Sequence, residues 1–196
     1  MRSTTDSPRS ASVWPWILLG AGLLLVIATG GAYAAITFGL VPANADAKPS
    51  AIERWAARTS LHATIARQAV NIADPLPHSP ANLDAGIKLY ANNCLVCHGA
   101  SDGKPSNVAR GLYQPVPQLG GHGVEDDPEG EIHWKIAHGI RLTGMPSFDG
   151  TLTDAQVWQL TQFLKQMDKL PPVERAAWKR LPSQAERTQR VAQKDN

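Results

Sequence analysis

Cys94-Leu95-Val96-Cys97-His98 is the stretch of the sequence that decides the fold. Its two cysteines, with two residues between them, can each add across a vinyl group of one porphyrin and form two thioether bonds. The histidine that follows directly is then placed beneath the iron as an axial ligand. This C-x-x-C-H pattern predicts covalent attachment of one haem c through Cys94 and Cys97, with His98 bound to the iron.

Two closely spaced cysteines also occur in zinc sites, redox-active pairs and structural disulfides. A zinc site needs about four ligands, and Cys94 and Cys97 are the only cysteines of the chain, so scattered histidines would have to complete it. A thioredoxin-like pair belongs to a βαβ unit, and the sequence has no alternating strand pattern. A disulfide across so short a loop stabilises little. The adjacent histidine and the lack of predicted strands favour haem attachment.

A methionine offers a second iron ligand, because a thioether sulfur is a common sixth ligand of electron-transfer haems. Met145 lies in the segment Thr143-Gly144-Met145-Pro146-Ser147-Phe148, outside any predicted helix, where glycine and proline favour a tight turn. Met1 begins the chain, and Met167 falls near the apolar stripe of the last predicted helix, where core packing is the simpler role. We therefore predict Met145 as the second axial ligand.

The hydrophobic periodicity around the motif predicts an all-α domain. Helices are predicted over residues 83–92 and 129–138, and a last helix is predicted to begin at Thr153 and to be stopped by Pro171-Pro172. Thr153 and Gln156 form a capping-box pattern at the start of the last helix. Residues 99–123 hold many glycines and prolines with little periodicity, so we predict a long loop, which in a small domain covers something.

An uncharged stretch precedes this domain. Residues 17–40 would span roughly 36 Å as a helix, enough to cross a bilayer. Trp14 and Trp16 stand at one end, where indole rings favour the lipid–water boundary. Small residues near Ala45 offer a signal-peptidase pattern, but the apolar run exceeds the roughly 7–15 residues of a signal peptide. We predict an uncleaved anchor.

Composition and charge complete the predicted organisation. The net charge is +2, and no basic patch suggests a nucleic-acid partner. The acidic run 125–131 is interpreted as a solvated helix start rather than a docking patch. A helix predicted at 51–70 either packs on the main domain or acts as a stalk. The predicted segments are a cytoplasmic arm at 1–15, a transmembrane anchor at 16–41, a linker with an accessory helix at 42–80, the haem domain at 81–172 and a basic tail at 173–196.

In these features the sequence resembles the class I c-type cytochromes, a family of small all-α monohaem domains. The likeness covers residues 81–172 and rests first on the attachment motif. Gly86 and Tyr90 precede that motif on one helix, and Gly144-Met145-Pro146 leads to a closing helix that carries Trp158. The resemblance implies a small cytochrome c domain whose long loops cover one haem, in a bacterial protein held by one transmembrane helix.

The resemblance also implies residues around the haem. In the family, a proline carbonyl accepts a hydrogen bond from the proximal histidine, and a leucine near it contacts the haem. Pro117 and Leu119 fit, with Pro115 as a rival and a proline-rich loop without a special contact as the plain alternative. Arg141 is a candidate partner of a haem propionate or a solvent-exposed arginine. His138 is an alternative sixth ligand or a hydrogen-bonded histidine at a helix end.

With both axial positions filled, the iron has no open site for a substrate, so the predicted activity is one-electron transfer between respiratory-type redox partners. No catalytic residue is predicted. Two alternatives stay open: a haem-bearing subunit of a larger membrane oxidoreductase complex, and an enzyme acting on a small molecule, which needs an open sixth position. Because the family acquires its haem outside the cytoplasm, the resemblance implies a bacterial inner-membrane protein with its haem domain in the periplasm.

Overall fold

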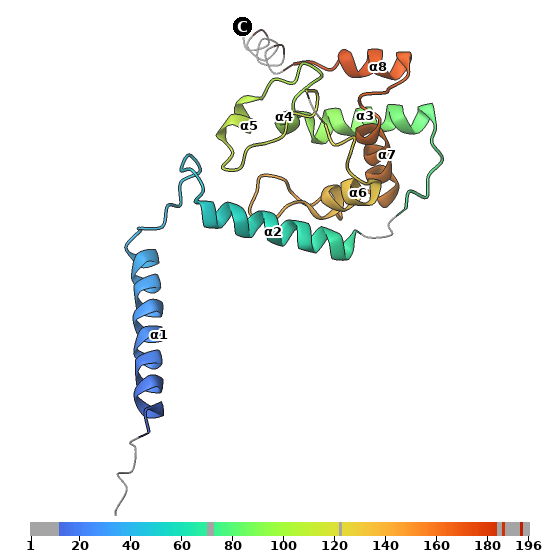
Figure 1. The fold of residues 1–196 in the computed structure, drawn as a ribbon. Helices are drawn as coiled ribbons and strands as arrows, with labels where there is room; N and C mark the ends of the chain where they lie inside the picture. Colours follow the sequence, from blue (N-terminus) through green and yellow to red (C-terminus); the bar gives the residue numbers. More distant parts are fainter. Residues whose placement is uncertain (1–11, 70–72, 122, 184–185, 187–192, 194–196) are drawn as a thin grey trace, which may run out of the picture. The chain divides into compact units, whose positions relative to one another are not determined.

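The computed structural model describes residues 12–69, 73–121, 123–183, 186 and 193 of the chain. Within these residues the regular structure is α-helical and no β-strand is present, which confirms the predicted all-α class (Figure 1). The chain divides into two compact units, Met1–Asn44 and Ala45–Asn196.

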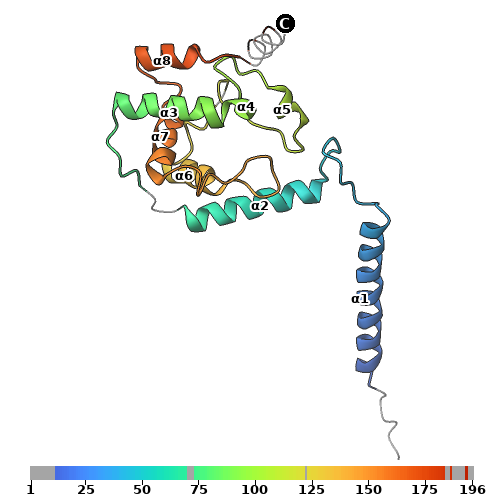
Figure 2. The ribbon, with the colours of Figure 1, turned by 180° about the vertical axis from the view of Figure 1, so that it is seen from behind.

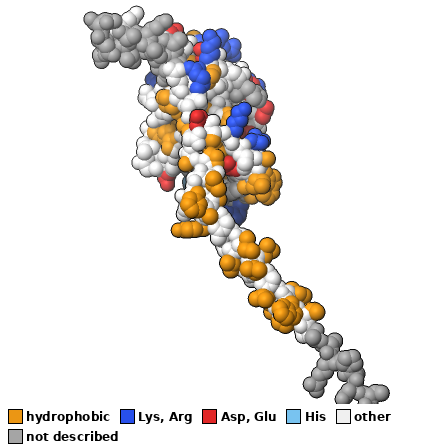
Figure 3. All heavy atoms as spheres, turned by 90° about the vertical axis from the view of Figure 1, so that its left-hand side faces the viewer, with side chains coloured by type: hydrophobic (Ala, Val, Ile, Leu, Met, Phe, Trp, Pro, Cys, Tyr) orange, Lys and Arg blue, Asp and Glu red, His pale blue; other side chains and the backbone are white. Residues whose placement is uncertain are grey.

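The first unit contains α1 (Trp14–Thr37), a helix without a charged side chain. An 18-residue window of α1 has a mean hydropathy of 2.0, and the length and composition of the helix suffice to cross a membrane. None of its side chains is buried, and hydrophobic groups cover it in Figure 3. Thr29 and Thr37 donate their hydroxyls to carbonyls one turn earlier, so these polar groups are satisfied within the helix. Residues 1–11 of the predicted arm lie outside the described residues.

The second unit is built around the crossing of α3 (Pro80–Asn93) and α7 (Asp154–Lys165). Gly86 lies at this crossing. A Cβ atom on Gly86 would stand 2.3 Å from the Gln159 carbonyl oxygen and 2.8 Å from the Cβ of Phe163. The absence of a side chain therefore lets the two helix backbones approach closely.

The remaining helices surround this crossing. α6 (Glu129–His138) packs against α7, and α8 (Pro172–Lys179) packs against α3 (Figures 1 and 2). α4 (Leu95–His98) follows α3 directly, and α5 (Asn107–Gly111) lies in the connection after it. α2 (Ala51–Gln68) contacts α6, so the accessory helix packs on the main domain rather than standing apart as a stalk.

Local sequence signals set several helix ends. At the start of α7, the Thr153 hydroxyl accepts a hydrogen bond from the Gln156 backbone while the Gln156 side chain accepts one from the Thr153 backbone, which confirms the predicted capping box. α6 has its predicted bounds and ends at Gly139, whose φ of +66° favours glycine. A second capping box, formed by Ser50 and Glu53, begins α2.

Several helix bounds differ from the predicted ones; α3, for example, is Pro80–Asn93 rather than 83–92. α7 ends at Lys165, several residues before the prolines that were expected to stop it. The predicted loop at 99–123 contains α5, because the Ser106 hydroxyl caps a short turn by accepting a hydrogen bond from the Ala109 backbone. α2 ends at Gln68, and Val70, the last residue of the predicted accessory helix, lies outside the described residues.

The hydrophobic core continues past residue 172, the predicted end of the haem domain. Trp178 of α8 is only 5% exposed and meets the rings of Tyr90 and Phe163 edge-on, with centroids 5.1 Å and 5.4 Å away. Proline is tolerated in the first turn of a helix, and Pro172 begins α8, which packs back onto α3. Residues 184–185, 187–192 and 194–196 of the predicted tail lie outside the described residues.

Candidate haem-binding site

The second unit encloses an apolar cavity of about 230 Å³. Side chains of the attachment motif, of the loop before α6, of α6 and of the loop after α6 line it. The predicted site residues in its wall are Cys94, Cys97, His98, Pro117, Leu119 and Met145. Apolar neighbours fill most of the remaining wall, among them Leu112, Val124, Ile132, Ile136, Ile140 and Phe148.

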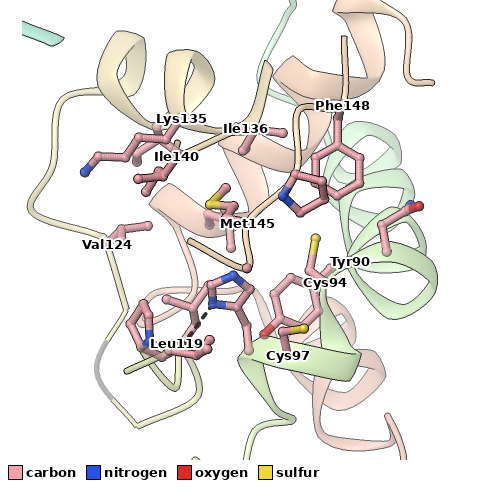
Figure 4. A pocket seen from close by; sticks show the side chains of 18 of the residues that line it. Tyr90, Cys94, Cys97, Leu119, Val124, Lys135, Ile136, Ile140, Met145 and Phe148 are labelled. Atoms are coloured by element: carbon pink, nitrogen blue, oxygen red, sulfur yellow. Dashed lines mark hydrogen bonds between the residues drawn. The ribbon is translucent and has the colours of Figure 1, made fainter. Parts of the chain in front are cut away.

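The attachment motif is held rigidly at the end of α3. Cys94 is the C-terminal cap of α3, and its carbonyl accepts hydrogen bonds from the backbone of Cys97 (3.0 Å) and of His98 (2.8 Å). This single turn brings both cysteines and the histidine to one wall of the cavity (Figure 4). Both thiols are free, so no disulfide joins them.

The environment of Cys94 argues against a redox-active pair. Burial, together with the charge of the neighbouring Cys97, raises the pKa of Cys94 to about 12. Reactive cysteines of redox pairs have lowered pKa values, because the thiolate is the nucleophile. In the part of the chain that the structure describes, no group of three or more His, Cys, Asp or Glu side chains is arranged to hold a metal ion, which removes support for the zinc alternative.

His98 is oriented by a backbone carbonyl. Its Nδ1 lies 3.0 Å from the carbonyl oxygen of Pro117, and the dashed line in Figure 4 marks this hydrogen bond. Burial lowers the pKa of His98, although the bond to Pro117 acts in the opposite direction. The imidazole is therefore neutral, and with Nδ1–H donating to the carbonyl, Nε2 keeps its lone pair for a metal. The backbone of Leu119 returns a bond to the His98 carbonyl at 3.2 Å.

Two further residues brace this turn. The side-chain amide of Gln118 donates to the carbonyls of Cys97 (3.1 Å) and Val116 (3.0 Å). The Tyr90 hydroxyl, which is fully buried, donates to the Gly99 carbonyl at 2.8 Å. Tyr90 was predicted on the apolar face of its helix and as part of the family resemblance, whereas nothing in the sequence pattern singled out the bracing role of Gln118.

A tight loop after α6 brings Met145 to the cavity. The carbonyl of Met145 accepts a hydrogen bond from the Ile140 backbone at 3.1 Å, and its N–H donates to the Thr143 hydroxyl at 3.1 Å. Gly139 permits the turn: a Cβ there would lie 2.5 Å from the Pro146 carbonyl carbon. In Figure 4 the Met145 side chain points into the cavity, and the sulfur atoms of both cysteines also lie there.

Met167, by contrast, is packed in the hydrophobic core and is not among the residues that line the cavity. The structure thus separates the two internal methionines, one at the cavity and one in the core.

This set of side chains fits a covalently bound haem. Two free thiols, one imidazole nitrogen and one thioether sulfur are the groups that c-type haem attachment and axial ligation require. The largely apolar wall suits a porphyrin, because ligand sites are concave and mostly apolar with a few placed polar groups. Cys94 and Cys97 would hold the porphyrin, and His98 and Met145 would hold the iron.

Comparison with known protein families supports a c-type cytochrome. Residues 81–164 match a family model described as cytochrome C oxidase, cbb3-type, subunit III. The matched segment runs from α3 through the attachment motif and the Met145 loop to α7. Residues 81–164 are a c-type cytochrome domain. No curated protein and no solved structure matches the chain.

Two residues of the cytochrome domain that were candidates for a place near the haem, Arg141 and His138, do not line the cavity. Arg141, the candidate propionate partner, is exposed and is not among the residues of the cavity wall. His138 is exposed as well, with its ring 4.9 Å from that of Trp134, so the structure does not bring it to the cavity.

Lys135 is the basic residue in the cavity wall of the cytochrome domain. Its Nζ lies 2.6 Å from a Glu131 carboxylate oxygen and 2.9 Å from one of Asp127. Burial acts to lower the pKa of Lys135, but the two carboxylates outweigh it and raise the pKa above 10.5. Two members of the acidic run, which the sequence analysis interpreted as solvated, therefore pair with a lysine at the cavity.

Proposed function

We propose that this protein is a membrane-anchored monohaem c-type cytochrome that carries single electrons between respiratory-type redox partners. The observation that supports the proposal most directly is the cavity wall: it contains both thiols of the attachment motif, His98 with its Nδ1 bonded to a carbonyl, and Met145. These side chains would supply the covalent attachment and the iron ligands of one haem.

The haem, when bound, supplies the electron-transfer chemistry, since its iron cycles between the ferrous and the ferric state. The protein's own residues do the positioning. The Pro117 carbonyl orients the imidazole of His98 and increases its basicity. The apolar wall excludes water from the cavity, which together with a thioether ligand favours a raised reduction potential.

A sixth iron position filled by Met145 would also bear on the type of reaction. Catalysis on a small molecule needs an iron with an open or labile position. The turn from Gly139 to Pro146 holds Met145 at the cavity by two hydrogen bonds of its own backbone. We therefore favour an electron carrier, without a catalytic residue, over a haem enzyme.

The location follows from α1 and from the need to assemble a c-type haem outside the cytoplasm. α1 would span the bacterial inner membrane, with the arm at 1–15 in the cytoplasm and the haem domain in the periplasm. An anchor of this kind raises the local concentration of the carrier near membrane oxidoreductases.

The name of the matched family favours one alternative. Because that family is described as a subunit of a cytochrome c oxidase, this chain is a candidate for the haem-bearing subunit of a larger membrane complex. Purification in mild detergent separates the two cases: a free carrier elutes as a single small species, and a subunit elutes with stable partner chains.

The first test of the proposal is a visible spectrum of the full chain matured in a host with c-type haem assembly. We expect sharp c-type bands in the reduced protein and a weak far-red ferric band that Met145→Ala abolishes. Met167→Leu is the matched control, because it replaces a core methionine by a side chain of similar volume. A high-spin wild-type spectrum with ready carbon monoxide binding would refute His/Met ligation and redirect the search to substrates.

A further inference from the structure

α2 lies outside the segment that matches the cytochrome family, yet it reaches the haem cavity. Leu61, in the middle of α2, is one of the residues that line the cavity, and every other lining residue falls within 81–164. Ile65, one turn further along, is 6% exposed and belongs to the buried apolar side chains. The cavity is therefore completed by a helix that the minimal domain lacks.

Two side-chain hydrogen bonds fasten α2 to the cytochrome domain, one on each side of Leu61. Near the start of α2, a Glu53 carboxylate oxygen accepts a hydrogen bond from the Tyr113 hydroxyl at 2.5 Å. At its end, the side-chain oxygen of Gln68 accepts a bond from the indole N–H of Trp134 at 3.2 Å. These two attachment points are about 22 Å apart along the helix axis, and they link α2 both to the loop before α6 and to α6 itself.

One face of α2 turns toward the cytochrome domain, and residues on other faces of the helix are exposed. Leu61 and Ile65, at helical spacing, turn toward the domain. Ile52 and Trp55 on the same helix are 77% and 68% exposed. Ile52 and Trp55 are far more exposed than Ile65, and Leu61 lines the cavity, so the contact with the cavity belongs to one face of α2.

We propose that α2 is a structural wall of the haem cavity and that Leu61 is a positioning residue that keeps water and small external ligands out. This inference rests on the proposed function, because it assumes that the cavity holds the haem. Without the Leu61 side chain, or with α2 released from its two attachment points, one side of the cavity opens to solvent. Solvent exposure is one of the factors that set haem potential, and exposure of a charged ferric centre to water favours the oxidised state.

The test uses the full-length, haem-loaded protein and four variants. Leu61→Ala removes the wall residue, and Gln68→Ala combined with Tyr113→Phe removes both attachments. Ile52→Ala is the matched control on the exposed face of the same helix, and Leu61→Met is the conservative rescue. Two quantities are measured: the rate at which imidazole binds the ferric protein, and the midpoint potential.

We expect Leu61→Ala to speed imidazole binding about fivefold or more and to lower the midpoint potential. Loss of one typical hydrogen bond should raise the population of molecules with α2 released about fivefold. The double variant loses two such bonds, so its imidazole-binding rate should rise about 25-fold. Ile52→Ala and Leu61→Met should match the wild type.

The outcomes separate this inference from the proposed function. If the wild type carries no covalent haem, the proposed function is refuted and the inference is refuted with it. If the wild type shows the expected c-type spectrum but Leu61→Ala and the double variant bind imidazole at the wild-type rate with unchanged potential, only the role of α2 is overturned. An equal effect of Ile52→Ala would also overturn it, because general destabilisation of the helix would then explain the data.

Discussion

Gly86→Ala tests the helix crossing on which the position of the attachment motif depends. A methyl group at this position would stand 2.3 Å from the Gln159 carbonyl oxygen and 2.8 Å from Phe163 Cβ, both short of an ordinary contact. The clash is with helix backbone, so α3 and α7 must move apart. Overpacking of this kind costs about 3 kcal/mol, and the better helix propensity of alanine returns about 1 kcal/mol.

The net expectation for Gly86→Ala is a loss of about 2 kcal/mol, which corresponds to a fall in Tm of about 4–8 °C for a chain of this size. Thermal unfolding followed by circular dichroism measures it. Gly111→Ala in α5 is the control, because no heavy atom apart from its chain neighbours and its own helix backbone lies within 4 Å of its Cβ position. Its Tm should stay near the wild-type value. A Gly86→Ala protein as stable as the wild type would refute the close approach of α3 and α7.

Trp178→Ala should lower the free energy of unfolding by about 3–5 kcal/mol, because it removes a 5% exposed indole from the core. The control Val173→Ala, on the exposed side of α8, should lower it by less than about 0.5 kcal/mol. Equal losses for the two variants in denaturant titrations would show that α8 does not stabilise the domain. The raised pKa of Lys135 gives a pH dependence: pairing with Asp127 and Glu131 contributes fully below pH 10.5 and is lost as the pH rises through the higher folded value. In denaturant titrations from about pH 9 to about pH 12, the wild type should therefore lose more stability than Lys135→Met, by up to about 1 kcal/mol, and parallel curves would contradict the pairing.

The local sequence was sufficient for features that depend on neighbouring residues. The all-α class, the bounds of α6 and the capping box of α7 follow from periodicity and from short-range hydrogen bonds between side chain and backbone. The attachment motif is equally local, because one helical turn brings Cys94, Cys97 and His98 to the same wall. The family comparison supports the c-type cytochrome that this motif predicted.

Contacts between distant segments could not be derived in this way. Whether Pro115 or Pro117 faces the imidazole was open in the sequence, and the fold brings the carbonyl of Pro117 to 3.0 Å from Nδ1. Charge alone made Arg141 a candidate at the haem, yet it is Lys135 that lies in the cavity wall. The position of Pro117 depends on how its loop is anchored at its two ends, and the position of Lys135 depends on how α6 packs. Periodicity encodes neither.

The sequence by itself therefore determined the chemistry available to this protein: two thiols, an imidazole and a thioether in a helical domain that follows an apolar helix along the chain. Only the tertiary structure decided that Leu61 of α2 and Trp178 of α8 belong to that domain. The physical reason is that the sequence of an amphipathic helix shows that the helix has an apolar face, but not which surface covers that face. That choice is made by the shape of the packed core and by single long-range hydrogen bonds such as the one between Gln68 and Trp134.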